Sequence, residues 1–375
     1  MRQVNSKSKI SDQSPTSLAS LFPALFVERL IEPLFAEQAR AERAAAFLGA
    51  PLAFACAQLC PCPTIDMDAL HARAAYETIL SSRTRSRAVK FAENLDADQI
   101  PSIAFKGLAT ALSVYPYPAY RLLPDVDFLF YEKDLPRLAE WLSAHGYATG
   151  LDHQPIRAWG ILTEASFAPI FQPDRTFFVD VHRAVNEPPI NRGLTTDLLF
   201  ARAEKIATKW GACRVTSHEH SFAIAALNLY RDFYRPEALK GLFDSCLILS
   251  RFGDQLDWTH MEEIARRGHF INRLVFFRDL LEALGAGRVP LFDDRSVSGC
   301  LRPTLDFVAK NCRSLDWLKM NDYRKLLLEI GLQDSPLVTL RSQWRRLRGI
   351  AAPASHYLPG LPVVTSMKTA NHSAA

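Results

Sequence analysis

The sequence predicts an α+β protein in which a small strand-containing unit lies between two helical regions. Apolar residues recur at helical spacing before about residue 98 and again after about residue 211. Short apolar runs bounded by turn residues, which are typical of strands, fall between these two regions. Hydrophobic residues make up 48% of the chain and charged residues 22%, enough apolar material for a sizeable core.

The N-terminal region is predicted to be helical. Apolar residues follow a helical spacing from Leu21 to Leu59, with interruptions at prolines. A second helical run extends from Ile65 to about Asn94, and Asp66 or Asp68 is suited to cap its first turn. The basic residues of this run are read mainly as a solvated face.

The central unit is predicted to alternate strands with helices and to end in a hairpin. The expected strands cover 103–105, 126–131, 167–171 and 176–182, with helices at 108–114 and 134–145. The turn of the hairpin is expected at 172–175, where the sequence reads Gln-Pro-Asp-Arg.

The C-terminal region is predicted to be helical at 218–234, 236–251, 259–284 and 304–317, with a basic helix after Pro336. That basic helix could steer RNA, but its arginines more often form a solvated face. The resulting division is a disordered tail (1–18), an N-terminal helical region (19–98), a core (99–210), a C-terminal helical domain (211–349) and a flexible tail (350–375).

Composition limits the classes of function. The net charge of +4 and the pI near 8.6 do not indicate the dense basic surface of a dedicated nucleic-acid binder. The polar start of the chain contains no signal-peptide core, and no apolar stretch is long enough to span a membrane. We therefore expect a cytoplasmic protein without membrane association.

The seven cysteines do not suggest a disulfide framework. Cys56, Cys60 and Cys62 are spaced as C-x3-C-x-C, and a metal site would need a fourth ligand, for which His71 is nearest. We favour the simpler interpretation that they are small hydrophobic residues near the end of an Ala-rich helix.

Asp125 and Asp127 are the first candidates for chemistry. They flank Val126 at the start of a predicted buried strand, and side chains two residues apart on a strand point to the same side. Two adjacent carboxylates repel each other unless a proton or a cation lies between them. A hard divalent cation such as Mg²⁺ prefers such oxygen ligands.

Asp180 and His182 share one face of a later apolar strand, Phe177 to His182. If this strand lies beside the first, Asp180 joins Asp125 and Asp127 in a three-carboxylate site. Such a site can hold metal ions that serve an in-line phosphoryl displacement. His182 either orients Asp180, contacts a nucleotide, or is simply a structural histidine.

Lys106 and Gly107 form a predicted strand-to-helix turn. The glycine permits close approach of a phosphate to free N–H groups at the helix start. Lys106 and Arg121 are suited to neutralise phosphate charge, although Arg121 could instead form a salt bridge with the aspartates.

These motifs, in this order, resemble the uncharacterised nucleotidyltransferase family of bacteria, within the polymerase-beta-like superfamily. The resemblance is close over about 100–190: a Lys-Gly turn, an Arg-x3-Asp-x-Asp strand, a helix ending in Gly-Tyr and a later Asp-x-His strand. It is looser through the C-terminal helices, where Lys240 and Asp244 match. The chain departs from better-known superfamily members, which have Gly-Ser or Gly-Gly where it has Lys106-Gly107.

The resemblance implies a small mixed β-sheet core and transfer of a nucleoside monophosphate from an NTP, such as ATP, to a hydroxyl-type acceptor. It implies Mg²⁺ or Mn²⁺ held by Asp125, Asp127 and Asp180, which are also the catalytic residues. The implied nucleotide-binding residues are Lys106, Gly107, Arg121, His182 and Lys240. For Lys240, an ordinary surface ion pair with Asp244 is the alternative.

The acceptor stays open between a small molecule, a protein and an RNA, and RNA is possible without being indicated. Two other functions also remain open. A catalytically silent nucleotide-binding or partner-binding scaffold would keep the same fold. A Mg²⁺-dependent phosphohydrolase would use the same carboxylates.

Overall fold

The computed structural model describes most of the chain: residues 21–149, 154–155, 165–167, 169–172, 176–231, 238–312 and 330–334. The predicted tails at 1–18 and 350–375 and the predicted basic helix after Pro336 lie outside these residues. So does the predicted turn between the hairpin strands, for residues 173–175.

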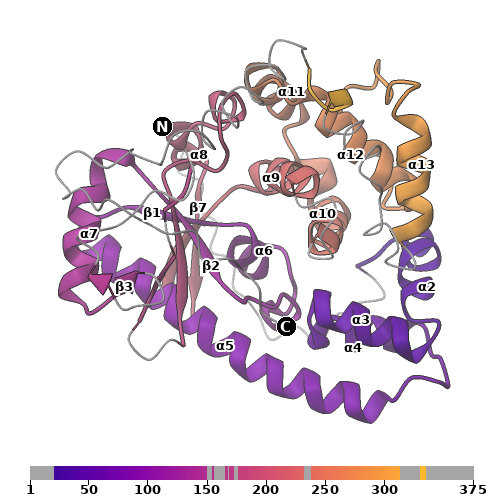
Figure 1. Cartoon of the computed structure of the whole chain (residues 1–375), viewed down its shortest axis with the longest axis horizontal. Helices are drawn as coiled ribbons and strands as arrows, with labels where there is room; N and C mark the ends of the chain where they lie inside the picture. The colour runs from indigo at the N-terminus through magenta and orange to yellow at the C-terminus, as the bar shows by residue number, and fades with distance from the viewer. Residues whose placement is uncertain are drawn as a thin grey trace.

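The chain contains a mixed β-sheet, as predicted, which lies in the left half of the view in Figure 1. Its eight strands lie in the order β4-β3-β5-β6-β2-β1-β8-β7. In chain order they are β1 (Ser102–Phe105), β2 (Val126–Phe130), β3 (Ala148–Thr149), β4 (Gln154–Pro155), β5 (Ile170–Phe171), β6 (Phe178–His182), β7 (Glu204–Thr208) and β8 (Gly211–Val215). Strand β1 runs antiparallel to β2 and parallel to β8, and β2 runs parallel to β6.

The two faces of the sheet have different neighbours. Phe128 and Phe130 of β2 lie in a core with residues of α5 (Met67–Ala97), α6 (Gly107–Ser113) and α7 (Leu135–Ala144). Because strand side chains alternate, Asp127 belongs to the opposite face. That face turns toward the C-terminal helices, where Phe105 and Leu129 join a second and larger core.

The N-terminal region is helical, as predicted. Its helices are α1 (Ala24–Phe26), a π-helical turn (Val27–Ile31), α2 (Glu32–Leu34), α3 (Gln38–Leu48), α4 (Ala50–Leu59) and the long α5. Asp66 caps α5, and its Oδ1 accepts a hydrogen bond from the Ala69 N–H at 2.9 Å. Helix α5 runs along the lower edge of the molecule in Figure 1, under the sheet and past α3 and α4.

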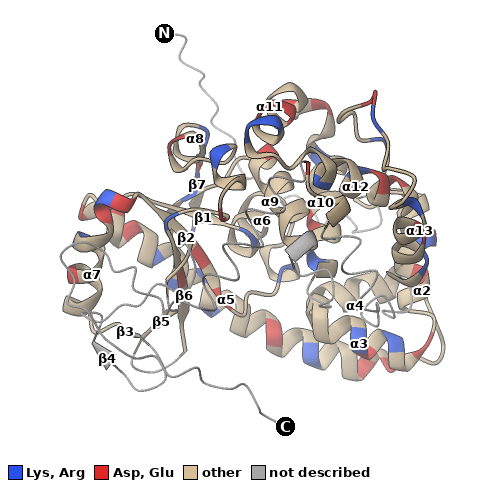
Figure 2. Ribbon diagram, turned by 45° about the horizontal axis from the view of Figure 1, so that its top comes forward, with Lys and Arg blue, Asp and Glu red and all other residues tan. Residues whose placement is uncertain are grey.

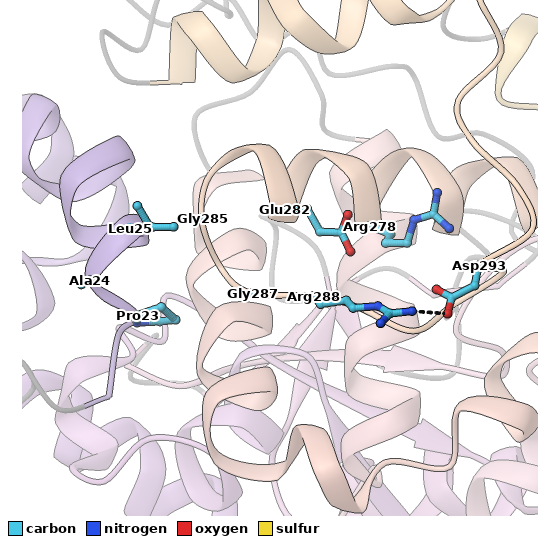
Figure 3. Close-up of a pocket in the computed structure, with 9 residues that line it drawn as sticks. All are labelled: Pro23, Ala24, Leu25, Arg278, Glu282, Gly285, Gly287, Arg288 and Asp293. Atoms are coloured by element: carbon cyan, nitrogen blue, oxygen red, sulfur yellow. Dashed lines mark hydrogen bonds and ion pairs between the residues drawn. The ribbon is translucent and has the colours of Figure 1, made fainter.

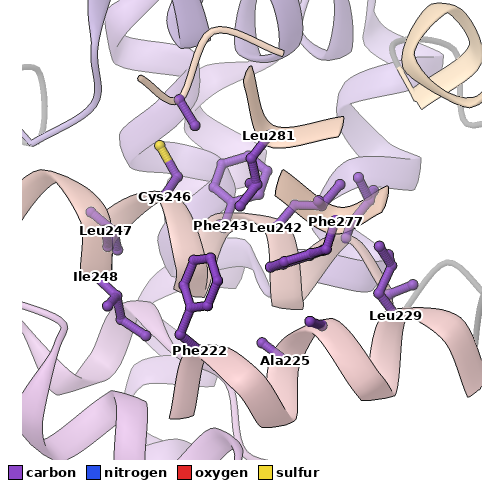
Figure 4. Close-up of a cluster of buried hydrophobic side chains, with 14 of the residues drawn as sticks. Phe222, Ala225, Leu229, Leu242, Phe243, Cys246, Leu247, Ile248, Phe277 and Leu281 are labelled. Atoms are coloured by element: carbon purple, nitrogen blue, oxygen red, sulfur yellow. The ribbon is translucent and has the colours of Figure 1, made fainter. Parts of the chain in front are cut away.

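The C-terminal region contains α9 (His218–Arg231), α10 (Ala238–Phe252), α11 (Trp258–Gly268), α12 (Ile271–Ala283) and α13 (Arg302–Asn311). Phe222 of α9, Phe243 of α10 and Phe277 of α12 meet in the shared core (Figure 4). Phe222 and Phe277 pack edge to face with ring centroids 5.4 Å apart.

The prediction of one helix over 259–284 was wrong. The helix ends at Gly268, and His269 adopts a left-handed conformation with φ of 55° before α12 begins. A Cβ at Gly268 would lie 2.9 Å from the Ile190 carbonyl oxygen and closer still to the Phe270 ring, so the turn needs a glycine. Continuous apolar spacing had hidden this break.

The β7–β8 hairpin was not predicted from the sequence. Strand β7 is mostly exposed, so it lacks the apolar run on which the other strand predictions rested. Gly211, with φ of 131°, begins β8. Residues 211–215 therefore belong to the central sheet, which continues past residue 210. Between β6 and β7 the chain forms α8 (Thr196–Ala201).

No helix among the described residues combines the length and the apolar character needed to cross a membrane.

Candidate metal and nucleotide site

Strand register places the central acidic residues side by side. Asp127 of β2 is opposite Phe105 of β1 on one side and Asp180 of β6 on the other. Leu129 is likewise opposite His182. Because β2 and β6 run parallel and in register, the two aspartates lie on the same face of the sheet.

Asp127, Asp180 and His182 form a cluster with the spacing of metal ligands. One ligand atom from each residue lies within 4.8 Å of the other two. Asp127 and His182 are buried and Asp180 is half-buried. The His182 Nε2 lies 2.9 Å from the Asp127 Oδ1, which ties the imidazole to the first carboxylate.

Lys106 contacts this cluster directly. Its ammonium donates a hydrogen bond to the Asp127 Oδ1. The Lys106 backbone has φ of 54° and ψ of −130°, which a residue with a side chain rarely adopts, and α6 begins at the next residue. Strain of this kind often marks a functional site, and here it turns the chain between β1 and α6.

The environment keeps Asp127 ionised. Burial raises the pKa of its carboxyl, but the Lys106 ammonium and the hydrogen bond from His182 outweigh this effect and hold the pKa well below the usual range. The Asp127 Oδ2 accepts no hydrogen bond from any described residue. An anionic oxygen is therefore available to a further cation.

Asp125 lies just before β2, outside the group of three, and is exposed at the opening of the site. Desolvation by the surrounding protein and the charge of Asp127 raise its pKa, while Lys106, Lys240 and Arg121 act in the opposite direction. The role of Asp125 as a metal ligand stays a prediction, and His182 is the third group that the structure brings to metal-ligand spacing.

Arg121 forms a buried ion pair with Asp244 of α10. Its Nε donates hydrogen bonds to both carboxylate oxygens, at 3.0 and 3.1 Å, and the Tyr115 hydroxyl lies 2.8 Å from the Asp244 Oδ1. Asp244 is buried. It pairs with Arg121 and does not form the surface ion pair with Lys240 that was the alternative prediction. The sequence predicted neither Tyr115 nor this pairing, because the residues concerned are far apart in the chain.

Gly107 provides space for Arg121. A Cβ at Gly107 would lie 3.5 Å from the Arg121 Nη2 and 3.0 Å from the Leu123 Cδ2. Nη2 donates no hydrogen bond to any described residue, since the bonds of Arg121 use Nε and Nη1. One end of the guanidinium thus lies beside the start of α6, where a phosphate could meet it.

A cavity of about 220 Å³ lies between this turn and the C-terminal helices. Lys106, Asp125 and Asp127 line it from the sheet, and Lys240 and Asp244 line it from α10. Its α9 wall consists of residues at helical spacing, Ser221, Ile224, Ala225, Asn228 and Leu229. Lys240 and Lys106 therefore line the same cavity, which a shared role in nucleotide binding would require.

Asn228 is a polar wall residue that the sequence analysis missed. Its Oδ1 is buried and accepts no hydrogen bond from a described residue. The sequence feature that could have identified Asn228 is that it is a single amide side chain within the apolar run Ala223 to Leu229.

The residues of the cluster fit a divalent cation. Two carboxylates and an imidazole converge in a partly buried site, and Asp127 already attracts the Lys106 ammonium. Carboxylate oxygens suit Mg²⁺ and Mn²⁺, while an imidazole ligand shifts the preference toward transition metals such as Mn²⁺.

The family model for uncharacterised nucleotidyltransferases matches residues 33–285, more than half of the chain. The chain belongs to this family. The match includes Lys106, Arg121, Asp127, Asp180, His182 and Asp244, so the site lies within the region that the family shares. The family predicted from the sequence is confirmed.

Other comparisons add little to the family match. An antigenic nucleotidyltransferase-like protein from Paracoccidioides brasiliensis is similar to 56% of this chain and 95% of its own, with 17% identity and a TM-score of 0.36. Proteins with curated descriptions gave no match.

A larger hollow lies beside α12, and its described lining residues include no group of potential metal ligands (Figure 3). Its volume is about 650 Å³. Arg288 pairs with Asp293 at 2.7 Å, and Arg278 donates to the backbone carbonyls of Leu291 and Phe292. The hydrogen bonds of Arg278 hold the 285–295 loop on α12, and the ion pair of Arg288 with Asp293 lies within that loop.

The Cys56, Cys60 and Cys62 group is not a metal cluster within the described residues. All three thiols are free. Cys56 is buried in the larger core, and His71 stacks on Phe54 with ring centroids 4.9 Å apart. Cys56 is thus a buried hydrophobic residue, as the simpler interpretation predicted, whereas Cys60 and Cys62 are partly buried against the same core.

Proposed function

We propose that the protein transfers a nucleoside monophosphate from an NTP, such as ATP, to a hydroxyl-type acceptor with Mg²⁺ or Mn²⁺. The observation that carries this proposal is the register of Asp127 with Asp180, which brings two carboxylates and His182 together in a chain of the nucleotidyltransferase family. The acceptor is a small molecule, a protein or an RNA.

Asp127 and Asp180 would hold the divalent cation, with Asp125 or His182 completing its ligands. When bound, the cation supplies charge neutralisation at the α-phosphate and at the leaving pyrophosphate. Asp127 is suited to this role because its pKa is lowered and it remains ionised at neutral pH.

The remaining residues would orient and neutralise the substrate. The acceptor hydroxyl attacks the α-phosphorus, its proton passes to Asp180, and the bond to the β-phosphate breaks to release pyrophosphate. Lys106, Lys240 and the free end of Arg121 would neutralise triphosphate oxygens, and the backbone at Gly107 would allow their close approach. His182 would hold Asp127 in place through its Nε2.

The second candidate is a catalytically silent nucleotide-binding scaffold. The contact between Lys106 and Asp127 favours it, because the ammonium neutralises the carboxylate that a cation would need. Intact Asp127 and Asp180 favour an active enzyme, since neither carboxylate is needed for scaffolding alone.

The test uses each of the four NTPs labelled at the α-phosphate, with Mg²⁺ or Mn²⁺, and follows the label. Covalent transfer that Asp127→Asn and Asp180→Asn abolish, and that the exposed control Asp254→Asn keeps, is the expected result. Binding without turnover would favour the scaffold, and conversion of the label to free NDP or NMP, with no labelled acceptor, would favour a phosphohydrolase. Circular dichroism checks that the variants remain folded.

A further inference from the structure

Phe178 is an exposed aromatic residue on the face of the sheet that carries the acidic cluster. It is 40% exposed, more than any other phenylalanine among the described residues. Its neighbour Phe177 is buried with Phe128 in the core on the other face. A single exposed apolar side chain is common on protein surfaces, so the position of Phe178 rather than its exposure decides what it can do.

Strand alternation and register place Phe178 beside two carboxylates. Phe178 and Asp180 are two residues apart on β6, so their side chains share one face and are about 6.6 Å apart along the strand. Val126 of β2 pairs with Val179 of β6. In the same parallel register, Asp125 lies next to Phe178. The ring is therefore a neighbour of two of the predicted metal ligands.

Phe171 of β5 supports the Phe178 ring from the side away from the cluster. The two residues are directly opposite each other in the antiparallel pair of β5 and β6, with ring centroids 6.1 Å apart. Phe171 is only 6% exposed, so it forms a buried base for the exposed ring. The sheet order β5-β6-β2 puts Phe171 on one side of β6 and Asp127 on the other.

The cations of the site lie on the opposite side of Asp127 from Phe178. Lys106 follows β1 and Lys240 belongs to α10, and β2 separates β1 from β6. In Figure 2, α10 lies to the right of β2 and β6. The attacking and leaving oxygens of a phosphoryl transfer lie on opposite sides of the phosphorus. If the two lysines hold the leaving pyrophosphate, the acceptor approaches from β6, where Phe178 lies.

We propose that Phe178 binds the acceptor, and that the acceptor is an uncharged phenol whose ring packs on Phe178 while its hydroxyl is directed to Asp180. This inference rests on the proposed transfer reaction and names the class of its acceptor. Contact between two aromatic rings is favourable in offset or edge-to-face arrangements. A hydroxyl borne directly on the bound ring bridges the spacing between positions 178 and 180 of the strand.

The charges around Phe178 favour an uncharged acceptor over the end of an RNA. Its neighbours along and across the strands on this face are Asp180, Asp125 and Phe171. None of the three is a cation, and an RNA would bring phosphates against the two carboxylates. The phenol that these neighbours accommodate is either a small molecule or a tyrosine side chain of a protein.

The proposed step forms a bond between the phenol oxygen and the α-phosphorus of the NTP. The phenol proton passes to Asp180, and the bond from the α-phosphorus to the bridging oxygen breaks to release pyrophosphate. The product is an aryl ester of the nucleoside monophosphate. A phenol loses its proton more readily than an alkyl alcohol, which suits a carboxylate as the proton acceptor.

Binding of a phenol without metal or NTP tests the role of Phe178 separately from the reaction. Fluorine NMR of para-(trifluoromethyl)phenol with the full chain should show binding that Phe178→Ala weakens about threefold or more, whereas Phe178→Trp keeps a ring and should stay near the parent. The control Tyr76→Ala removes an exposed ring from α5 and should also stay near the parent. Equal affinity in the parent and Phe178→Ala would overturn the proposal.

The cyclohexanol counterpart of this probe has nearly the same size but no aromatic ring. It should bind about threefold or more weaker than the phenol. Equal affinity for the two probes would mean that the site selects apolar size and not a ring, and would overturn the assignment of a phenol. Circular dichroism checks that the variants remain folded.

Transfer of label from NTPs labelled at the α-phosphate tests the acceptor itself, with Mg²⁺ or Mn²⁺ present. Label should move to the phenol but not to the cyclohexanol or to the terminal hydroxyl of an oligouridine. Phe178→Ala should raise the KM for the phenol about fivefold and leave the KM for the NTP near that of the parent, a split that a purely structural role would not produce.

A blocked Gly-Tyr-Gly peptide distinguishes the two sources of the phenol. More efficient labelling of the peptide would indicate a protein tyrosine, and more efficient labelling of the free phenol would indicate a small molecule. Transfer to the alcohol or the RNA but to neither phenol would overturn this inference and keep the transfer reaction. Phenol binding that depends on Phe178, with no transfer to any acceptor, would support the phenol site and contradict the transfer reaction alone.

Discussion

Lys106 controls the charge of the acidic cluster. Its ammonium lies beside the Asp127 carboxylate and neutralises the negative charge that a divalent cation would otherwise neutralise. The residue is held there by an unusual backbone conformation, with φ of 54°, rather than by a flexible loop. We infer that the Lys106 ammonium and a divalent cation compete for the Asp127 charge, and that cation binding is tighter once the Lys106 side chain turns toward substrate phosphate.

Lys106→Met should therefore increase affinity for Mn²⁺ in the absence of nucleotide. Removing a positive charge in direct contact with a ligand carboxylate favours cation binding, by about tenfold or 1.4 kcal/mol. Electron paramagnetic resonance of free Mn²⁺ measures this directly. The exposed control Lys310→Met should have no effect, and unchanged or weaker binding in Lys106→Met would contradict the inference.

At the level of elements, the ion pair of Arg121 with Asp244 fastens α10 to the segment before β2. Both residues are buried, and the Tyr115 hydroxyl adds a third contact. Removing one member of a buried ion pair leaves an uncompensated charge, which is far more destabilising than loss of one neutral hydrogen bond.

Asp244→Ala should thus lower the free energy of unfolding by about 3–5 kcal/mol. Tyr115→Phe removes only the hydroxyl contact and should cost about 1 kcal/mol. Urea denaturation of the two variants measures the difference. A loss in Asp244→Ala no larger than that in Tyr115→Phe would show that the ion pair does not fasten α10.

Helices α9 and α11 are joined by a pair of histidines. The His220 Nε2 lies 3.1 Å from the His260 Nε2, and both residues are buried. Burial, and then the charge of His260, lower the pKa of His220 to about 4. The unfolded chain takes up the proton near pH 6.5, so protonation favours unfolding.

Neutral His220 should make its full contribution to the free energy of unfolding above about pH 6.5. This contribution should fall as the pH drops toward 4, by about 3 kcal/mol at most. Urea denaturation at several pH values between 7.5 and 4.5 measures this loss. His220→Gln should have a flatter profile than the parent, whereas the exposed control His145→Gln should retain the parental slope. Identical slopes in the parent and His220→Gln would be inconsistent with a buried neutral pair.

The parts of the structure that the sequence predicted depend on local patterns. Val126 to Phe130 and the residues around Asp180 are apolar runs with inward aspartates, so strands and carboxylates were visible together. The β7–β8 hairpin carries no such run, and His269 breaks a helix whose apolar spacing continues through it. Local pattern fails where tertiary contacts decide the conformation.

The candidate site was predictable only to the extent that it lies on strands. That Asp127 would be opposite Asp180 depended on the parallel pairing of β2 with β6, which the sequence suggested but did not determine. The partner of Arg121 proved to be Asp244, because α10 folds back over the turn before β2. Packing of elements that are distant in the sequence also explains why Asn228 lines the cavity and why the Tyr115 hydroxyl contacts Asp244.

For the whole molecule, the site combines three segments that are distant in the chain. The turn at Lys106, the strand pair of Asp127 and Asp180, and the α9–α10 wall with Lys240 all contribute. A ligand that bridges these segments binds only the folded chain. It should therefore stabilise the sheet and the C-terminal helices together.

A non-hydrolysable NTP analogue with Mn²⁺ should raise the melting temperature of the full chain in a single transition. At a hundred times the Kd, binding contributes about 2.7 kcal/mol to the free energy of unfolding. Differential scanning calorimetry should show this rise for the parent and for Asp254→Asn, but much less for Asp127→Asn, which lacks a charged ligand for the cation. If only one of two transitions moved, the ligand would be held by the sheet or by the helices alone, and the cavity between them would not be the nucleotide site.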